Sequence, residues 1–403
     1  MTMKVGVGVS KDKNASQAGY EAAKVAVQKG GFEKADFIIA FASPVFDQNE
    51  LLNGIKEATS NVPMAGCTTA GEITNDGPTT GSVSVMAIAA DNIKFYTGLG
   101  KDVKKSAREA GRAVAKEVKE KAEKAGDSLR TFIMFPDVLT GNGADAVRGV
   151  LDVLGEHFPI VGGAPGDDFL FKQTFEYRDG ELASGAIAGI GLSGKFSMGV
   201  GVRHGWMPIG LPMTVTRSEG AVLHELNGKP AINIYEEYFG EKAEELRKEA
   251  LARMAITYPL GIKVPDYEEE YLIRDPITVD EKGSITCAAE IPEGSEVRLM
   301  IGSKEKAVEA AQDAARRLMK AFEADNATPK LALVFNCIAR EKLFAQKAND
   351  EIQAVRAIIG KDVPMLGFYT YGEQAPIGGE LREAAKINPR FYNETIVMLA
   401  IGE

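Results

Sequence analysis

One short stretch of the sequence holds a thiol, two hydroxyls and a carboxylate. It reads Gly66-Cys67-Thr68-Thr69-Ala70-Gly71-Glu72 and follows Pro63. A thiol can attack a carbonyl carbon when a base lies beside it. Hydroxyls and backbone N–H groups can bind a small polar group, and a carboxylate can accept hydrogen bonds from an ammonium. The stretch is therefore a candidate for catalysis or for ligand binding.

The same pattern occurs twice more along the chain. A copy without gaps follows Pro364 and ends at Glu373, and a weaker copy follows Pro159 and ends at Asp168. In each copy a Gly comes three residues after the Pro and an acid comes nine residues after it. Each loop alone is also typical of a tight turn that an acid caps. The recurrence favours a shared scaffold with a ligand site at some of the loops.

What differs between the copies matters more than what they share. The position of Cys67 holds Gly163 in the second copy and Phe368 in the third. The scaffold therefore does not require a thiol, and a small, half-buried pocket wall is the more typical role for such a cysteine. A cysteine-dependent enzyme that acts on an amide or thioester, with Cys67 as its nucleophile, stays the alternative function. The chain has only three His residues, and none lies in a recognisable Cys/His signature.

An arginine follows the strand expected over residues 331–335. Arg340 could bind a carboxylate through two N–H groups, or it could form an ion pair with Glu341 or Glu351. The aromatic side chains of the third copy are more typical of a core than of a ligand cage. The predicted ligand-binding residues are Cys67, Thr68, Thr69, Glu72, Gly162, Gly163, Asp167, Asp168, Asn336, Arg340, Tyr369, Thr370, Tyr371, Glu373 and Asn393.

No metal or cofactor is predicted. The Gly-rich stretch that starts at Gly162 fits neither the dinucleotide fingerprint nor the phosphate loop. Asp167 and Asp168 lack the further oxygen ligands that Mg²⁺ or Ca²⁺ requires, and the scattered His and Cys residues show no zinc spacing.

Composition limits the cellular context. The chain has 403 residues, 45% hydrophobic and 26% charged, which is ordinary for a globular protein and long enough for two domains. It shows no signal peptide and no apolar run of membrane-spanning length, and its three Cys are odd in number and far apart. We expect a cytoplasmic protein without membrane contact. A net charge of −10 disfavours a nucleic-acid partner.

Helical and strand patterns alternate in the same order three times. Each unit has a helix, a buried strand, a second helix, a Pro-Gly loop and a closing strand; the closing strands are expected over residues 81–88, 185–192 and 395–401. Residues 283–286 and 296–302 are expected to lead into the third unit, and a charged helix is expected over 241–254. These patterns predict an α/β (α+β) fold, with mixed β-sheets flanked by helices and duplicated β-α-β-α-β units. The predicted domains are residues 1–213 and 214–403.

The sequence resembles the FIST-domain proteins, a prokaryotic sensory family with a FIST N and a FIST C domain. The N-terminal likeness rests on the first two loops. The C-terminal likeness rests on Val222–Ala231, Tyr258–Gly261, Tyr271–Arg274, Asn336–Arg340 and Gly367–Glu373. The resemblance implies a sensor in signal transduction that binds a small molecule, with an amino acid as the expected ligand class, and implies no catalytic residues. Because no fused output domain is evident, it also implies a signalling protein in trans.

Overall fold

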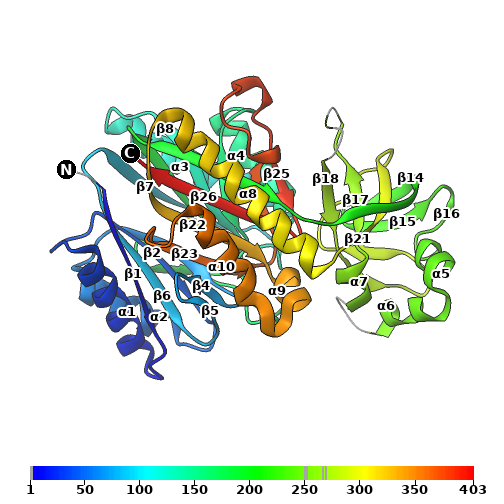
Figure 1. Cartoon of the computed structure of the whole chain (residues 1–403), viewed down its shortest axis with the longest axis horizontal. Helices are drawn as coiled ribbons and strands as arrows, with labels where there is room; N and C mark the ends of the chain where they lie inside the picture. The colour runs from blue at the N-terminus through cyan, green and yellow to red at the C-terminus, as the bar shows by residue number, and fades with distance from the viewer. Residues whose placement is uncertain (1–2, 249–252, 266, 268–269) are drawn as a thin grey trace.

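Three stretches of the chain fold into the same unit, in which a sheet carries two long helices on its outer face (Figure 1). The structure is a computed structural model and describes residues 3–248, 253–265, 267 and 270–403. Unit one consists of β1 (Lys4–Ser10), α1 (Ala15–Gly30), β2 (Phe37–Ala42), α2 (Gln48–Thr59), β3 (Met64–Thr68), β4 (Glu72–Thr74), β5 (Gly77–Thr79) and β6 (Val83–Ala89).

Unit two repeats this order. It consists of β7 (Ile93–Gly100), α3 (Ala107–Lys124), β8 (Leu129–Pro136), α4 (Gly143–Leu154), β9 (Ile160–Gly163), β10 (Glu176–Arg178), β11 (Glu181–Ala183) and β12 (Ile187–Gly194). Unit three consists of β13 (Ser197–Arg203), α8 (Lys304–Asp325), β22 (Pro329–Cys337), α9 (Ile338–Phe344), η2 (Ala345–Lys347), α10 (Ala348–Ile359), β23 (Met365–Thr370), β24 (Glu373–Pro376), η3 (Ile377–Gly379), η4 (Ala384–Lys386), β25 (Pro389–Tyr392) and β26 (Ile396–Gly402).

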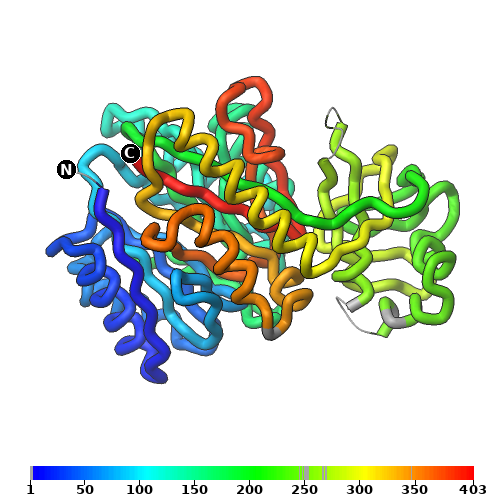
Figure 2. The backbone as a smooth tube through the Cα atoms, viewed as in Figure 1, coloured from blue at the N-terminus to red at the C-terminus, as the bar shows by residue number. Residues whose placement is uncertain are grey.

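A separate domain is inserted into unit three, and we call residues 207–301 the inserted domain. It lies at the right of the view in Figure 2, beside α9 and away from α1. Its elements are β14 (Met207–Glu219), β15 (Val222–Leu226), β16 (Lys229–Pro230), α5 (Asn233–Phe239), η1 (Gly240–Glu244), α6 (Glu245–Lys248), α7 (Arg253–Thr257), β17 (Leu260–Lys263), β18 (Tyr271–Arg274), β19 (Pro276–Val279), β20 (Ile285–Cys287) and β21 (Glu296–Ile301).

Side-chain caps begin the long helices. Asn14 accepts a hydrogen bond from the backbone N–H of Gln17 at the start of α1. Asn142 accepts from two backbone N–H groups at the start of α4, and Ser303 accepts from the backbone N–H of Lys306 at the start of α8. Such caps satisfy N–H groups that the first helical turn leaves without partners. The expected mixed α/β fold with helix-flanked sheets is confirmed.

The first strand of unit three was expected in the wrong place. Residues 296–302 were expected to lead into the unit, but β21 pairs with β14 and β17 in the inserted domain. The leading strand is β13, which pairs with β26 over its whole length. Apolar patterning identifies a strand but not the strand with which it pairs. The sequence pattern therefore could not reveal that a domain is inserted between β13 and α8. The boundary at 213/214 falls inside β14 and stays a prediction.

The charged helix expected over residues 241–254 is broken. The structure gives the 3-10 turn η1 followed by the short helices α6 and α7. Residues 249–252 of the expected helix lie outside the described residues.

The three units are joined by exchange of hairpins. The first unit's hairpin β4–β5 extends the sheet of unit three beside β23, in the order β13-β26-β22-β23-β4-β5. The second unit's hairpin β10–β11 extends the sheet of unit one beside β3, and the third unit's hairpin β24–β25 extends the sheet of unit two beside β9. Each unit therefore completes the sheet of another, in a closed cycle.

The inner faces of the three sheets meet in one apolar core. Alternate residues of each central strand point inward, while the residues between them pack beneath the helices. Phe41, Phe135 and Phe335 occupy equivalent positions on β2, β8 and β22. Phe368 contacts all three, with ring centroids 4.5, 6.3 and 5.8 Å away. One large side chain from unit three therefore fills the centre where the units meet.

We expect Phe368→Ala to lower the free energy of unfolding by about 3–5 kcal/mol, because it leaves a cavity between three rings. Urea denaturation followed by circular dichroism measures this change. Leu211→Ala, at a side chain that is 81% exposed, is the control and should change the same quantity by less than about 0.5 kcal/mol. Equal effects of the two substitutions would contradict the central role of Phe368.

Candidate functional site

The three Pro-Gly loops lie against one another and are joined by backbone hydrogen bonds. The N–H of Ala70 donates to the carbonyl of Tyr369 (3.1 Å), and the N–H of Tyr371 donates to the carbonyl of Ala164 (3.1 Å). The N–H of Gly166 donates to the carbonyl of Thr68 (3.1 Å), which closes the cycle. All three loops meet, and Ala70, Asp168 and Tyr369, one residue from each loop, line the cavity described below.

Three buried glutamates begin the exchanged hairpins. Glu72 pairs in register with Phe368, Glu176 with Cys67, and Glu373 with Gly163. The equivalent of Glu72 in unit two is thus Glu176. It is not Asp168, which stands nine residues after Pro159, because the loop between β9 and β10 is longer in unit two. Constant spacing could not reveal an acid displaced by a longer loop.

The buried glutamates are held by hydroxyl groups of their own loops. Thr69 donates to the Glu72 carboxyl (2.5 Å), which also accepts from Ser82. Thr370 donates to Glu373, and Thr174 donates to Glu176 (3.2 Å). Their hydroxyl partners and complete burial leave these carboxyls without access to a ligand.

Burial also sets the charge of these carboxyls. All three glutamates have zero exposed surface. Loss of water raises the pKa of Glu72 to about 8 and raises the pKa values of Glu176 and Glu373 well above their usual range. The Glu72 carboxyl is therefore mostly neutral at pH 7, and burial favours the protonated form of Glu176 and Glu373.

Cys67 lies in the central core and not at a cleft. It is fully buried among the side chains of the inner sheet faces. Burial, followed by the nearby Glu176 and Glu72, raises the pKa of its thiol well above the usual range. A thiol nucleophile needs access and a lowered pKa, so this environment opposes the cysteine-enzyme alternative.

Arg340 forms a buried ion pair. Its guanidinium contacts the carboxylate of Glu351, and both side chains have zero exposed surface. Further N–H groups donate to the carbonyls of Ala307 (2.9 Å) and His204. Asn336 donates to the second oxygen of Glu351 (2.8 Å). Of the two roles weighed for Arg340, the structure places it in the ion pair, although buried instead of at the surface.

Asp167 organises an unusual loop in unit two. Its carboxylate accepts hydrogen bonds from the backbone N–H groups of residues 171, 172 and 173 and from the Tyr371 hydroxyl. Asp168, Phe169 and Phe171 have φ angles of 53°, 66° and 52°, a region that non-glycine residues rarely adopt. Such outliers cluster at functional sites. This loop covers one side of a cavity.

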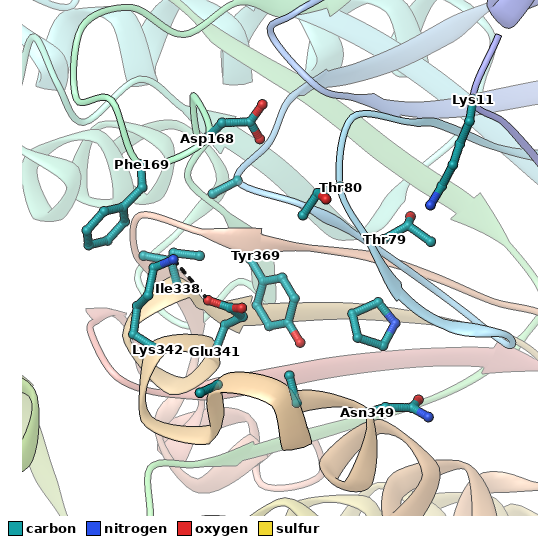
Figure 3. A pocket seen from close by; sticks show the side chains of 14 residues that line it. Lys11, Thr79, Thr80, Asp168, Phe169, Ile338, Glu341, Lys342, Asn349 and Tyr369 are labelled. Atoms are coloured by element: carbon teal, nitrogen blue, oxygen red, sulfur yellow. Dashed lines mark ion pairs between the residues drawn. The ribbon is translucent and has the colours of Figure 1, made fainter.

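We call this space the Tyr369 cavity; it has a volume of about 430 Å³ (Figure 3). All three units contribute to it: β5 and the residues after it from unit one, Asp168 and Phe169 from unit two, and α9, the start of α10 and Tyr369 from unit three. Its polar side chains are those of Lys11, Thr79, Thr80, Asp168, Glu341, Lys342, Asn349 and Tyr369. A volume of this size holds a small metabolite.

The Tyr369 hydroxyl is the most informative atom of the cavity. The side chain is 2% exposed, and its hydroxyl has no hydrogen-bond partner among the residues that the structure describes. Figure 3 shows the ring between the helical wall and Thr80, at the middle of the lining residues. Leaving a buried hydroxyl without a partner costs about 1–3 kcal/mol, and a hydrogen bond to this oxygen would remove that cost.

Charged side chains of both signs line the cavity. In the view of Figure 3, Asp168 lies at the upper left and Lys11 at the upper right, both above the Tyr369 ring. Asp168 accepts from Ser43 (2.7 Å), and partial burial raises the pKa of its carboxyl. Glu341 and Lys342 form an ion pair (3.3 Å) on the wall formed by α9. The cavity thus offers separate cationic and anionic contacts.

The predicted ligand-binding residues divide into two groups. Asp168 and Tyr369 line the Tyr369 cavity. The others are buried in the central core, in the loop cluster, in β9 or in the Arg340 network, and Asn393 is buried directly after β25. Six further lining residues come from separate elements and form no motif, so sequence patterns did not indicate them: Lys11, Thr79, Thr80, Glu341, Lys342 and Asn349. Among the described residues, no group of three or more His, Cys, Asp or Glu side chains could hold a metal ion.

These features define an α/β protein of three hairpin-exchanging units with an inserted domain. The FIST N domain family matches residues 36–229, and the FIST C domain family matches residues 231–376. The chain therefore belongs to the FIST family, as the sequence motifs predicted. FIST domains are associated with sensory signal transduction. In the described part of the chain, no helix combines the length and apolarity needed to cross a membrane.

The similar proteins are themselves uncharacterised. One from Methanocaldococcus jannaschii is 27% identical over 76% of this chain and 61% of its own length. One from Mycobacterium tuberculosis is 26% identical over 55% of this chain and 57% of its own. The chain thus spans about three fifths of the length of these relatives.

Solved structures offer only distant likenesses. A cyanuric acid hydrolase from A. caulinodans aligns with 48% of this chain and 72% of its own, at 7% identity and a TM-score of 0.29. PurLQS from Thermotoga maritima aligns with 99% of this chain and 72% of its own, at 8% identity and a TM-score of 0.21. Both TM-scores are too low to assign a shared fold.

We expect stability to depend on pH through Glu72. Its pKa is higher in the folded than in the unfolded chain, so its contribution is complete below about pH 4 and declines as pH rises toward about 8. Glu72→Gln keeps a neutral side chain of the same shape. Relative to the native protein, this variant should gain on the order of a few kcal/mol in free energy of unfolding between pH 5 and pH 8. Urea denaturation across this range measures the gain, and a constant difference would show that Glu72 is ionised in the fold.

We expect the three cysteines to react slowly with iodoacetamide in the native protein. Cys67, Cys287 and Cys337 are buried, and burial raises the pKa of each thiol. Mass spectrometry at pH 7.5 should find little labelling of the native chain and complete labelling in urea, which serves as the control. Fast, selective alkylation of Cys67 would restore the enzyme alternative.

Proposed function

We propose that this FIST protein is a small-molecule sensor that binds its ligand in the Tyr369 cavity. One observation carries the proposal: the buried Tyr369 hydroxyl has no partner in the described structure and belongs to a side chain that lines a cavity with charges of both signs. A ligand that supplies one hydrogen bond to this oxygen would remove the cost of its burial.

The ligand class that fits is an amino acid. Its ammonium would lie at Asp168, whose carboxylate is disfavoured by partial burial and would gain from a nearby positive charge. Its carboxylate would lie at Lys11, which Figure 3 shows at the upper right of the view. The sequence suggested acids of the loops, such as Glu72 and Glu373, for the ammonium and Arg340 for the carboxylate. Those three side chains are fully buried and already bonded, so Asp168 and Lys11 take these roles in the proposal.

The position of the cavity suits a sensor. A bound ligand would touch all three units at once and would tighten the hairpin exchange between units one and three. It would also contact α9, whose Ala339 and Leu343 pack with Ile256 of the inserted domain. Binding could then alter how the inserted domain is held, which is a route to a signalling protein in trans.

We expect at least one of the twenty amino acids to raise the melting temperature in a thermal-shift screen, followed by calorimetric titration. Tyr369→Phe should weaken that binding about fivefold, the worth of one neutral hydrogen bond, while thermal stability without ligand is unchanged or slightly higher. The matched control is Tyr392→Phe, since Tyr392 is also buried with an unpartnered hydroxyl but lies outside the cavity.

Two outcomes would contradict the proposal. The first is the absence of stabilisation by any amino acid. The second is an equal loss of affinity in the Tyr369 and Tyr392 variants, which would show that the cavity is not where the ligand lies.

A further inference from the structure

A second cavity lies between the three-unit body and the inserted domain. It has a volume of about 560 Å³ and is lined by α4, β25 and the strands β17 and β18. We call it the inter-domain groove. Its walls are mainly apolar, and their larger side chains are Val147, Leu151, Ile262, Leu272 and Phe391. It shares no residue with the Tyr369 cavity.

The charged residues of the inter-domain groove are mostly basic. Four are basic (Arg148, Lys263, Arg274 and Arg390) and two are acidic (Glu290 and Glu296). The groove therefore carries a formal charge of +2, from four positive and two negative side chains, in a protein with a net charge of −10. Such a local reversal of charge favours an anionic ligand.

Arg274 is a buried cation in the wall of the inter-domain groove. Its side chain is 2% exposed, and its hydrogen bonds go to the backbone carbonyls of Glu290 (2.8 Å), Ile273 (2.8 Å) and Phe391 (3.4 Å). It forms no ion pair with a carboxylate in the described part of the chain. Burial lowers the pKa of the guanidinium to about 10, which reflects the cost of this charge away from water.

Two acids, Glu290 and Asp275, lie near Arg274, and both are engaged with other side chains. Asp275 shares a hydrogen bond with Glu394. Glu290 forms an ion pair with Arg148 and accepts from Asn142 (3.2 Å). At the rim, Arg390 is exposed and has no partner within the described ranges. A buried arginine bonded only to carbonyls, beside an apolar wall and a second arginine, is a site for a charged head on an apolar body.

We propose that the inter-domain groove binds an amphipathic carboxylate, with its carboxylate at Arg274 and Arg390 and its apolar body along α4 and β17–β18. This site is separate from the amino-acid site of the proposed function. Because its walls come from the body and from the inserted domain, such a ligand would bridge the two and fix their contact. The protein would then respond to a second class of metabolite.

Calorimetric titration of the whole protein with decanoate tests the proposal, with decanol as the probe of equal chain length and no charge. We expect decanoate to bind at least tenfold more tightly than decanol, because an ionic hydrogen bond to a buried guanidinium distinguishes them. Arg274→Gln should remove this preference. Equal binding of the two probes, or no binding of decanoate, would overturn the proposal.

A second pair of variants covers the case in which Arg274→Gln does not fold. Leu151→Glu places a carboxylate on the groove wall and should weaken decanoate binding at least tenfold. Leu154→Glu is its matched control on the same helix, because Leu154 does not line the groove, and should leave binding unchanged. Tyr369→Phe should also leave decanoate binding unchanged, which separates this test from that of the amino-acid site. Equal effects of the two leucine variants would overturn the proposal.

Discussion

The structure depends on the exchange of hairpins between units. Without it, β3, β9 and β23 would each present a row of unpaired N–H and C=O groups at the edge of a sheet. In the folded chain each of these edges is covered by a hairpin from another unit. The cycle closes only when all three units are present, so no single unit has a complete sheet. Ordering of one loop is thereby coupled to the order of the other two.

The exchange of hairpins explains why polar side chains that could take part in catalysis or binding are buried. The first residue of each exchanged hairpin lies at the centre of the cluster, where Glu72, Glu176 and Glu373 meet hydroxyl groups and no water. A neutral carboxyl there can accept two hydrogen bonds and donate one. It thereby satisfies polar groups that the turn leaves inside. Glu72 and Glu373, which the Pro-Gly repeat singles out in the sequence, therefore stabilise the contact between the units.

Local patterns predict much of the fold and little of the site. Helices and buried strands follow from periodicity and caps, as at Asn14 and Ser303, and the repeat of the Pro-Gly loop predicts repeated units. Strand partners are set by tertiary contacts, so neither the hairpin exchange nor the role of β13 could be read from a linear pattern. The same holds for the Tyr369 cavity: Lys11 and Asn349 are ordinary surface residues until the fold brings them together.

The three similar junctions between units differ in the side chain that each places at the position of Tyr369. The position of Tyr369 is held by Thr68 in unit one and by Ala164 in unit two, as the strand registers show. The Thr68 hydroxyl accepts from the backbone N–H of Phe175 (3.0 Å) and is satisfied within the fold. Alanine has no polar atom to satisfy. Only the third unit places a long side chain there whose hydroxyl has no partner in the described structure. The shared features build the contact between the units, and the difference between the copies leaves the Tyr369 hydroxyl without a partner in the described structure.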